Sequence, residues 1–461
     1  MKNLIIYISL MMIVFLGLNM RKFSYAEVPF PGENADEYSF GWLGISLVKD
    51  KYPIAWSGVP PYVHDYQKIN VDRVFDKDPN RVPFPIDKPW FDHPPLFGLL
   101  VGGYAYFEGV RDFASASVLI LRRPMIILAI INILLVFILG TLVHKRKLGL
   151  LASAIYAFSP LIAISQRLAL AENGYIPLFL ISLIFSVLYF KLKQIKFWYL
   201  ACSVSGVSIL FKLSALAIPI SLLLLVFLEK KKFDLTLIKP VIIAIIAPLV
   251  IFVLYGALFD LNMFIRVFEM NSGRLLGAGA EIFYQAVASS KIMSQRTFTD
   301  GWILAGWLSI FVLVIRGVYK NLLVKVIFSA VAAYFFIFMI FGGESYGWYR
   351  YPFYPLLSLS LAWMLITIYK KANLLVGYML FLLPFGTSMH RLLGIEGFRQ
   401  YASIFRLVTI VIFGFTILTL LNWKKAAFVN RILLIFLLLM AFFLSYKEVF
   451  FYNEANWIFS T

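Results

Sequence analysis

Residues 33–38 read Glu-Asn-Ala-Asp-Glu-Tyr, and residues 90–96 read Trp-Phe-Asp-His-Pro-Pro-Leu. Both stretches lie in a polar, proline-rich segment, residues 21–123, that separates the first apolar run from the rest of the chain. Most of the remaining sequence consists of apolar runs typical of helices in lipid. We therefore interpret the chain as a membrane-embedded scaffold that holds two polar turns beside the lipid surface.

Composition places the chain among polytopic membrane proteins. Of its 461 residues, 61% are hydrophobic and only 14% are charged, which is more apolar surface than a soluble protein of this length could bury. The net charge of +18 does not indicate nucleic-acid binding, because Lys and Arg cluster in short loops between apolar runs, where they set topology and meet anionic headgroups. The single cysteine, Cys202, excludes an intrachain disulfide.

The apolar runs predict an all-α fold with about thirteen transmembrane helices. The first helix takes residues 1–20, and residues 124–461 form a single integral membrane domain that holds the other twelve. Their predicted bounds are 124–143, 148–166, 174–190, 197–211, 214–228, 238–259, 301–315, 322–341, 352–369, 373–389, 402–421 and 431–447. With the N-terminus inside, every inside loop after the first span carries at least two Lys or Arg residues, as the positive-inside rule requires.

Residues 21–123 then form an extracytoplasmic loop, which we expect to be the catalytic segment. Ser24-Tyr25-Ala26 is typical of a signal-peptide cleavage site, but we expect a retained anchor because the first apolar run continues to Met20. Apolar residues at helical spacing predict two short juxtamembrane helices, at 38–48 and 96–107. The charged, proline-rich stretch 65–87 between them is predicted to be a loop.

Asp36 and Glu37 are the first candidates for chemistry. Adjacent residues on a helix point about 100° apart, so the two carboxylates cannot form a facing acid pair. One of them can face a reaction centre while the other orients a neighbour or a metal. The simpler interpretation is that both are ordinary first-turn charges that favour the helix dipole, with Asn34 or Asp36 as a cap.

Asp92 and His93 precede two prolines, which force the preceding residues out of helical conformation and pre-shape a turn. An acid and an imidazole presented in such a turn suit a metal ion or a phosphate group. The alternative is that the turn serves only as a rigid lead into the helix predicted to start at Leu96.

Ionisable and polar residues recur at the outer ends of the predicted spans. They are Arg167, Glu172, Asn173, Lys212, Glu344, Tyr349 and Arg350. Ionisable groups at membrane depth are costly and usually face a cavity, and Lys and Arg pair readily with phosphate. Any one of these cations is most simply a side chain that reaches to the interface. Together, on one side of the membrane, they favour a site for an anionic lipid headgroup.

The order and spacing of several short motifs resemble the GT-C class of membrane glycosyltransferases. The chain is similar to the family 39 protein O-mannosyltransferases and to the aminoarabinose transferases that modify lipid A. The resemblance is good over residues 1–230 and thin afterwards. The motifs are Asp36-Glu37 after the first span, His93-Pro94-Pro95-Leu96, Arg123-Pro124, Ser159-Pro160, the stretch from Arg167 to Glu172, the stretch from Gly206 to Lys212, and Arg350-Tyr351-Pro352.

The resemblance implies an inverting glycosyltransferase of the cell membrane, with its active site facing outside the cytoplasm. Such enzymes pass a hexose or pentose from a polyprenyl-phosphate donor to a lipid, glycan or protein acceptor, in protein glycosylation or cell-envelope synthesis. Asp36 matches the general base, with Glu37 beside it as the second catalytic candidate. The donor-phosphate candidates are Lys212 and Arg350, followed by His93 and Tyr349, and the further substrate-site candidates are Arg167, Glu172, Asn173 and Glu344.

Two departures from these relatives affect what can be carried over. In the aminoarabinose enzymes an acid–Lys pair occupies the positions of Asp92 and His93, so a divalent metal at Asp92 is left open, and no other cofactor is expected. The fungal and animal mannosyltransferases carry a large lumenal domain between later spans. In this chain the corresponding loop, residues 260–300, has only about forty residues, so their acceptor specificity cannot be transferred.

Two other classes of function compete with glycosyl transfer. A lipid or polysaccharide flippase should carry ionisable residues near mid-membrane and broken or repeated helices. An oligosaccharide ligase or polymerase would be expected to centre on a large loop between late spans. Because the polar residues gather at the outer ends of the spans and in the first outer segment, the sequence favours the transferase.

Overall fold

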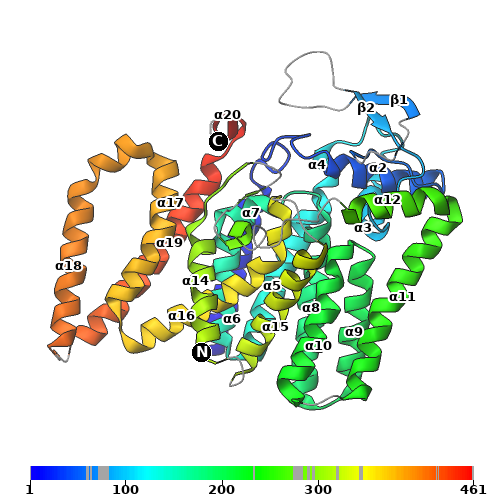
Figure 1. The fold of residues 1–461 in the computed structure, drawn as a ribbon. Helices are drawn as coiled ribbons and strands as arrows, with labels where there is room; N and C mark the ends of the chain where they lie inside the picture. Colours follow the sequence, from blue (N-terminus) through cyan, green and yellow to red (C-terminus); the bar gives the residue numbers. More distant parts are fainter. Residues whose placement is uncertain are drawn as a thin grey trace.

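The computed structural model describes residues 2–58, 62, 65–70, 83–231, 234–273, 284–287, 291–292, 296–317, 321–341, 346–421, 423 and 425–458. It is a bundle of long helices capped at one end by a layer of short ones (Figure 1). The predicted all-α polytopic fold is confirmed. The N-terminus and the C-terminus lie at opposite ends of the bundle (Figure 1).

Every predicted apolar run contains a helix. The long helices are α1 (Lys2–Lys22), α5 (Arg123–Val143), α6 (Arg146–Phe158), α8 (Ala171–Leu192), α9 (Ile195–Ile209), α10 (Ala217–Lys230), α11 (Leu235–Phe259), α14 (Gly301–Ile315), α15 (Leu322–Phe341), α16 (Tyr354–Lys371), α17 (Leu374–Gln400), α18 (Ala402–Leu420) and α19 (Ala426–Phe451). Within the described residues, nine helices are long and apolar enough to cross a membrane. The count of thirteen spans therefore stays a prediction.

Two breaks between helices fall at positions that matter for the site, one inside a predicted run and one between two predicted runs. The run 148–166 divides at Ser159 into α6 and the short α7 (Pro160–Ser165), because Pro160 has no N–H to continue the helix and Ser159 is extended. The chain is also extended at Lys212, between α9 and the 3-10 helix η1 (Leu213–Leu216) that leads into α10. Both breaks fall at the end of the bundle that carries the short helices.

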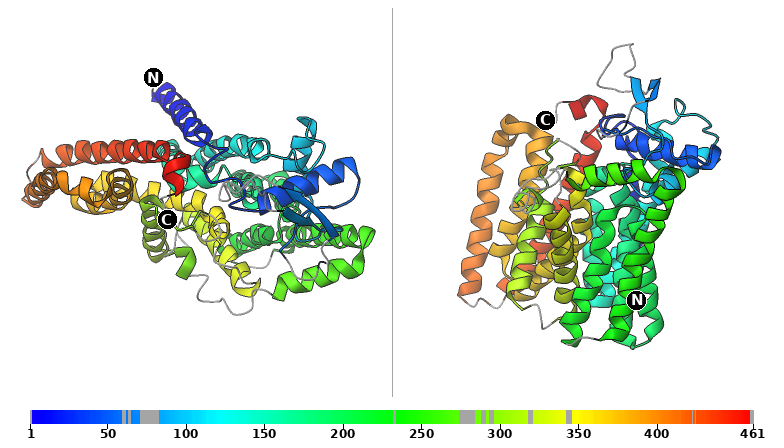
Figure 2. Two further views of the ribbon diagram at one scale, coloured as in Figure 1. Left: turned by 90° about the horizontal axis from the view of Figure 1, so that it is seen from above. Right: turned by 45° about the vertical axis from the view of Figure 1, so that its right-hand side comes forward.

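The layer of short elements consists of α2 (Asp36–Lys49), α3 (Leu96–Phe107), α4 (Val118–Leu121), α12 (Leu261–Gly273), β1 (Asp65–Asn70) and β2 (Pro83–Ile86). Both predicted juxtamembrane helices are confirmed, as α2 and α3. The loop predicted at 65–87 is wrong at its ends, where β1 and β2 pair antiparallel with Ile69 opposite Phe84. The prolines of β2 are compatible with pairing because each strand of a two-stranded sheet is an edge strand. Figures 1 and 2 show this layer across one end of the bundle.

Glycines allow α2 and α3 to cross in backbone contact. A Cβ atom on Gly44 would lie 1.9 Å from the carbonyl oxygen of Gly98, and one on Gly102 would lie 2.0 Å from that of Gly41. Any side chain at these positions would push the two helices apart. The crossing thereby sets how the first turn of α2, which carries Asp36, lies relative to the His93-Pro94-Pro95 turn before α3.

The last helices extend away from the rest of the bundle. In Figures 1 and 2, α17, α18 and α19 form a group of helices beside the main bundle, with α18 farthest from the bundle. Only 6% of the apolar window of α18 is buried, as expected of a helix surrounded by lipid. The candidate site lies at the other side of the molecule, under the short helices.

Candidate active site

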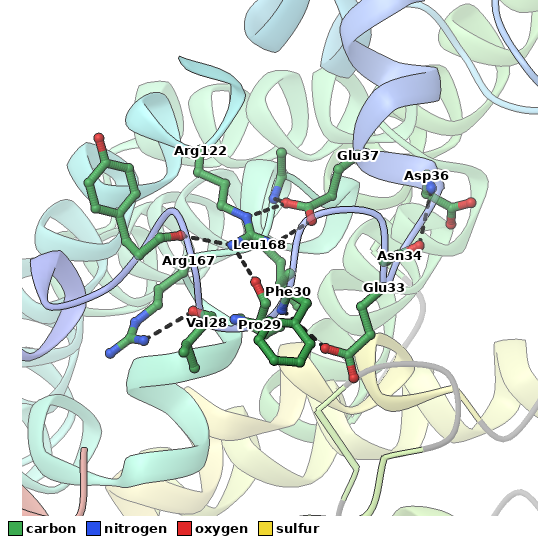
Figure 3. A network of polar contacts seen from close by, with 12 residues as sticks. Val28, Pro29, Phe30, Glu33, Asn34, Asp36, Glu37, Arg122, Arg167 and Leu168 are labelled. Atoms are coloured by element: carbon green, nitrogen blue, oxygen red, sulfur yellow. Dashed lines mark hydrogen bonds and ion pairs between the residues drawn. The ribbon is translucent and has the colours of Figure 1, made fainter. Parts of the chain in front are cut away.

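Glu37 lies at the centre of a buried ion pair. Its Oε1 and Oε2 atoms accept hydrogen bonds from Nε and Nη2 of Arg122, at 2.8 and 2.7 Å, and both side chains are fully buried. Oε1 also accepts from the backbone N–H of Ala169 at 2.8 Å. Arg122 Nη1 donates to the carbonyl oxygens of Tyr25 and Pro29 (Figure 3). The pair therefore joins α2 to the start of α5, the α7–α8 loop and the linker after α1.

Asp36 points away from this pair (Figure 3). Its backbone N–H donates to Oδ1 of Asn34 at 3.1 Å, although the N-cap position of α2 is taken by Ala35 and not by Asn34 or Asp36 as one of the sequence interpretations expected. The Asp36 side chain is partly exposed and lines a small pocket. The roughly 100° between neighbouring helical residues explains how one carboxylate is buried in the scaffold while the next reaches the pocket.

Two further buried arginines hold α1 and the linker that follows it against the rest of the bundle. Arg167 donates from Nη1 to the carbonyl oxygen of Val28 at 3.0 Å and from Nη2 to that of Met20 at 2.7 Å (Figure 3). Arg21 donates to Oε1 of Gln166 and to backbone oxygens of α6. These contacts favour a structural role for Arg167, whose predicted part in substrate binding no contact in the structure tests.

Asn173 makes similar local contacts. Its Nδ2 donates to the carbonyl oxygens of Ser165 and Leu168, at 2.8 and 2.9 Å, and the residue is 3% exposed. The side chain therefore holds the α7–α8 loop against the first turn of α8. Its predicted place in the substrate site stays a prediction.

Lys212 and Glu172 form a second buried pair. Lys212 Nζ lies 2.6 Å from Oε1 of Glu172, and it lies 5.2 Å from the centre of the Tyr349 ring and 5.9 Å from that of Trp348. Lys212 is also close enough to Asp36 for the two charges to interact. The structure therefore brings Glu172, Lys212 and Tyr349 together from three separate elements, at the end of the bundle where α2 with Asp36 also lies.

Arg350 lies in the 3-10 helix η2 (Gly347–Phe353), one residue after Tyr349. It is 5% exposed, and it donates from Nε to the carbonyl oxygen of Gln285 and from Nη1 to that of Tyr346, both at 3.0 Å. A guanidinium stays charged at neutral pH even when it is buried, so Arg350 brings a positive charge to this end of the bundle. Glu344, the remaining candidate of this motif, lies outside the described residues.

The pocket beside Asp36 is lined by residues from α2 and from both ends of the hairpin segment. Its lining residues are Asp36, Ser39, Phe40, Trp56, Ser57, Gly58, Trp90, Asp92 and His93, and its volume is about 30 Å³. The His93 ring stacks on Phe40, with 5.4 Å between ring centres. His93 is therefore placed at the pocket, and its predicted contact with a donor phosphate stays a prediction.

Asp92 is held by hydroxyl groups. Ser57 Oγ donates to Oδ2 of Asp92 at 2.5 Å, and the hydroxyl of Tyr62 also hydrogen-bonds this carboxyl. Burial, followed by the nearby charges of Asp36 and Asp87, raises the pKa of Asp92 to about 7. The sequence interpretation missed Ser57 and Tyr62, for which the only signal was the concentration of aromatic residues in this part of the loop.

The described residues contain no group of three or more His, Cys, Asp or Glu side chains arranged to hold a metal ion. A divalent metal at Asp92 therefore stays a prediction, and we assign no step of the reaction to it.

A helical bundle capped by two crossed juxtamembrane helices is the fold that the resemblance seen in the sequence implied, and comparisons with known proteins confirm that resemblance. The family model described as dolichyl-phosphate-mannose-protein mannosyltransferase matches residues 92–256. A comparison with curated protein sequences gives no match.

Two solved structures are similar over nearly the whole chain. One is the archaeal oligosaccharyltransferase AglB from Archaeoglobus fulgidus in complex with an inhibitory peptide and a dolichol-phosphate, with a TM-score of 0.54, 12% identity and coverage of 97% of this chain and 56% of that one. The other is ArnT from Cupriavidus metallidurans bound to undecaprenyl phosphate, with a TM-score of 0.51, 13% identity and coverage of 97% and 77%. The chain thus spans just over half the length of AglB. At these identities the likeness shows the fold.

Proposed function

We propose that the chain is an inverting glycosyltransferase that moves a sugar from a polyprenyl-phosphate donor to an acceptor outside the cytoplasm. The observation that carries the proposal is the convergence of Asp36 with the buried Lys212–Glu172 pair at one end of the bundle. It is supported by the two GT-C structures, whose ligands are dolichol-phosphate and undecaprenyl phosphate. Both ligands carry the phosphate that a lysine at this position would bind.

Asp36 serves as the general base in this proposal. Its carboxylate takes the proton of the acceptor hydroxyl as the hydroxyl oxygen bonds to the anomeric carbon of the donor sugar. The bond from that carbon to the phosphate oxygen breaks on the opposite face, so the configuration inverts and the polyprenyl phosphate leaves with the electron pair. The reaction requires base, hydroxyl oxygen and anomeric carbon to lie nearly in line.

The leaving phosphate needs charge stabilisation more than protonation, because it is already a good leaving group. Lys212 supplies a positive charge, and an ammonium has three N–H donors, of which one serves Glu172. Two donors therefore remain for phosphate oxygens. We assign Arg350 and Tyr349 to the same role, with the Tyr349 ring against the ammonium keeping it in place.

Glu37 acts in this proposal as a positioning residue. Its ion pair with Arg122 fixes the first turn of α2, and with it the backbone of Asp36. The extracytoplasmic orientation is supported by the charge bias of the inside loops and by the site lying at the end of the bundle opposite the N-terminus (Figure 1). The acceptor is a lipid, glycan or protein of the cell envelope, and the chain is an integral protein of the cell membrane.

The test measures transfer from labelled polyprenyl-phosphate hexoses to crude membrane acceptors in proteoliposomes. Asp36→Asn is expected to lower transfer by about 10²–10⁴-fold with unchanged donor binding. Asp50→Asn is the matched control, since Asp50 is an exposed acid at the other end of the same helix. Full transfer by Asp36→Asn would move the base elsewhere, and a wild type that transfers nothing but scrambles labelled lipid would favour a flippase.

A further inference from the structure

The pocket between α2 and the turn before α3 is lined by both aromatic and acidic residues. Its lining includes the partly exposed Trp56 and the buried Trp90 and Phe40, together with the acids Asp36 and Asp92. At about 30 Å³ the pocket holds a single hydroxyl group and not a sugar ring. Asp36 is one of the residues that line it, so the pocket adjoins the proposed base.

The two carboxyl oxygens of Asp92 differ in their hydrogen bonding: Oδ2 has a partner in the structure, and Oδ1 has none. Ser57 Oγ donates to Oδ2, and the Tyr62 hydroxyl, which accepts from the backbone N–H of Phe91 at 2.7 Å, keeps its own proton for Asp92. The other oxygen, Oδ1, is buried and has no hydrogen-bond partner in the structure. A buried polar atom without a partner is unfavourable, and a hydroxyl that donates to it would remove that penalty.

The support behind Asp92 is rigid. Asp87 Oδ2 accepts from the backbone N–H of Ser57 at 2.8 Å. The backbones of Ala55 and Asp87 also exchange two hydrogen bonds, from Asp87 N–H to the Ala55 carbonyl oxygen at 2.7 Å and from Ala55 N–H to the Asp87 carbonyl oxygen at 3.2 Å. This bridge holds Ser57 in the position from which it donates to Asp92. The unsatisfied oxygen is therefore held in place before any ligand arrives, as a preorganised binding group should be.

We propose that this pocket binds one hydroxyl group of a sugar substrate through Oδ1 of Asp92, with the partly exposed Trp56 against the apolar C–H groups beside that hydroxyl. A hydroxyl is both donor and acceptor, so it pairs with a neutral or an ionised carboxyl. The inference rests on the proposed transfer reaction at Asp36 and adds a specificity residue to it. Asp92 acts on a substrate hydroxyl that does not react.

Ligand binding to the full chain in detergent, followed by saturation-transfer NMR, tests the inference. The probes are the methyl glycosides of mannose, glucose and galactose, together with the four monodeoxy derivatives of the glycoside that binds. In the wild type, removal of one particular hydroxyl is expected to weaken binding at least fivefold, and removal of the others should have smaller effects.

Substitution of Asp92 should then remove this discrimination. In Asp92→Leu the parent glycoside is expected to bind as weakly as the deoxy derivative, because hydroxyl and carboxyl form one interacting pair. Asp92→Asn should keep most of the discrimination, since an amide retains a donor and an acceptor, and it also controls for folding. Asp50→Leu, at an exposed acid beside the end of α2, is the matched control and should bind like the wild type.

Three results would overturn the inference: a wild type that binds none of the glycosides, a wild type that ignores all four deoxy positions, and an Asp92→Leu variant that discriminates like the wild type. A failure of the proposed function is distinguishable from these. If hydroxyl discrimination depends on Asp92 but no polyprenyl-phosphate donor supports transfer, the pocket stands and the transferase proposal falls. If transfer occurs without such discrimination, only the pocket falls.

Discussion

Substitution of Arg122 by methionine should break the structure where the first outer segment joins the bundle. The change removes the partner of Glu37 while leaving the carboxylate fully buried. Removing one partner of a buried ion pair typically costs about 3–5 kcal/mol, because the remaining charge is uncompensated. The carbonyl oxygens of Tyr25 and Pro29 lose their donor at the same time. We expect a destabilisation of about 3–5 kcal/mol and a loss of sugar transfer.

The neighbouring arginine provides the control. Arg123 also faces an acid, Glu108, at 3.1 Å, but their side chains are 40% and 41% exposed. Exposed pairs of this kind contribute little. Arg123→Met should therefore leave both stability and transfer close to those of the wild type, although the two substitutions differ by only one position.

Cys202 makes the measurement direct. It is the only cysteine in the chain and is buried in α9, so unfolding exposes it to a thiol-reactive dye. A thermal scan in detergent with such a dye should show Arg122→Met unfolding at a clearly lower temperature than Arg123→Met. An Arg122→Met protein that unfolds with the wild type and transfers sugar normally would refute the positioning role of the Glu37–Arg122 pair.

Three shorter predictions test other parts of the site. Gly102→Ala should push α2 and α3 apart, lower the free energy of unfolding by about 1–3 kcal/mol and reduce sugar transfer. Gly103→Ala is the control: its added methyl group would meet its nearest neighbour, the Val48 side chain, only at 3.9 Å. It should therefore unfold with the wild type in the same thermal scan. Lys212→Met should weaken donor binding in a titration assay and leave Glu172 as a buried charge without its partner. Lys212→Arg, which keeps the positive charge, should restore part of the binding. Equal donor binding by the wild type and both variants would contradict the role of Lys212 in phosphate binding. The pKa of Asp92 in the folded protein, about 7, lies above the ordinary value of 3.8. The free energy of unfolding should therefore fall as pH rises from about 4 to 7, because the unfolded protein loses the Asp92 proton first, and should level off above pH 7. Circular-dichroism melts of Asp92→Asn should lack this fall, and a variant with the same pH profile as the wild type would contradict the raised pKa.

The helices of this protein were predictable because their signals are local. An apolar run of a given length, and the periodicity of 38–48 and 96–107, depend only on neighbouring residues. The break at Lys212 was expected from an interrupting charge, whereas the break before Pro160 divides a run that was predicted to be continuous, at 148–166. The hairpin at 65–87 was missed, because strand pairing joins residues far apart in the chain and its prolines resemble those of a loop.

The candidate site was predictable only as a set of residue types. Asp36, His93, Glu172, Lys212 and Tyr349 were all named from motifs. The structure places Asp36 and His93 at one pocket and joins Glu172 to Lys212. What no motif could supply was the partner of each side chain.

The sequence alone thus determined the class of fold, the position of nearly every helix and the segment in which the site lies, because hydrophobic length and periodicity are properties of contiguous residues. The tertiary structure alone decided which of two adjacent acids, Asp36 or Glu37, reaches the pocket and which of two adjacent arginines, Arg122 or Arg123, is buried with its partner. It also revealed the hydroxyls that hold Asp92. Burial and pairing depend on contacts between distant segments, and neighbours in a helix can therefore differ completely in both.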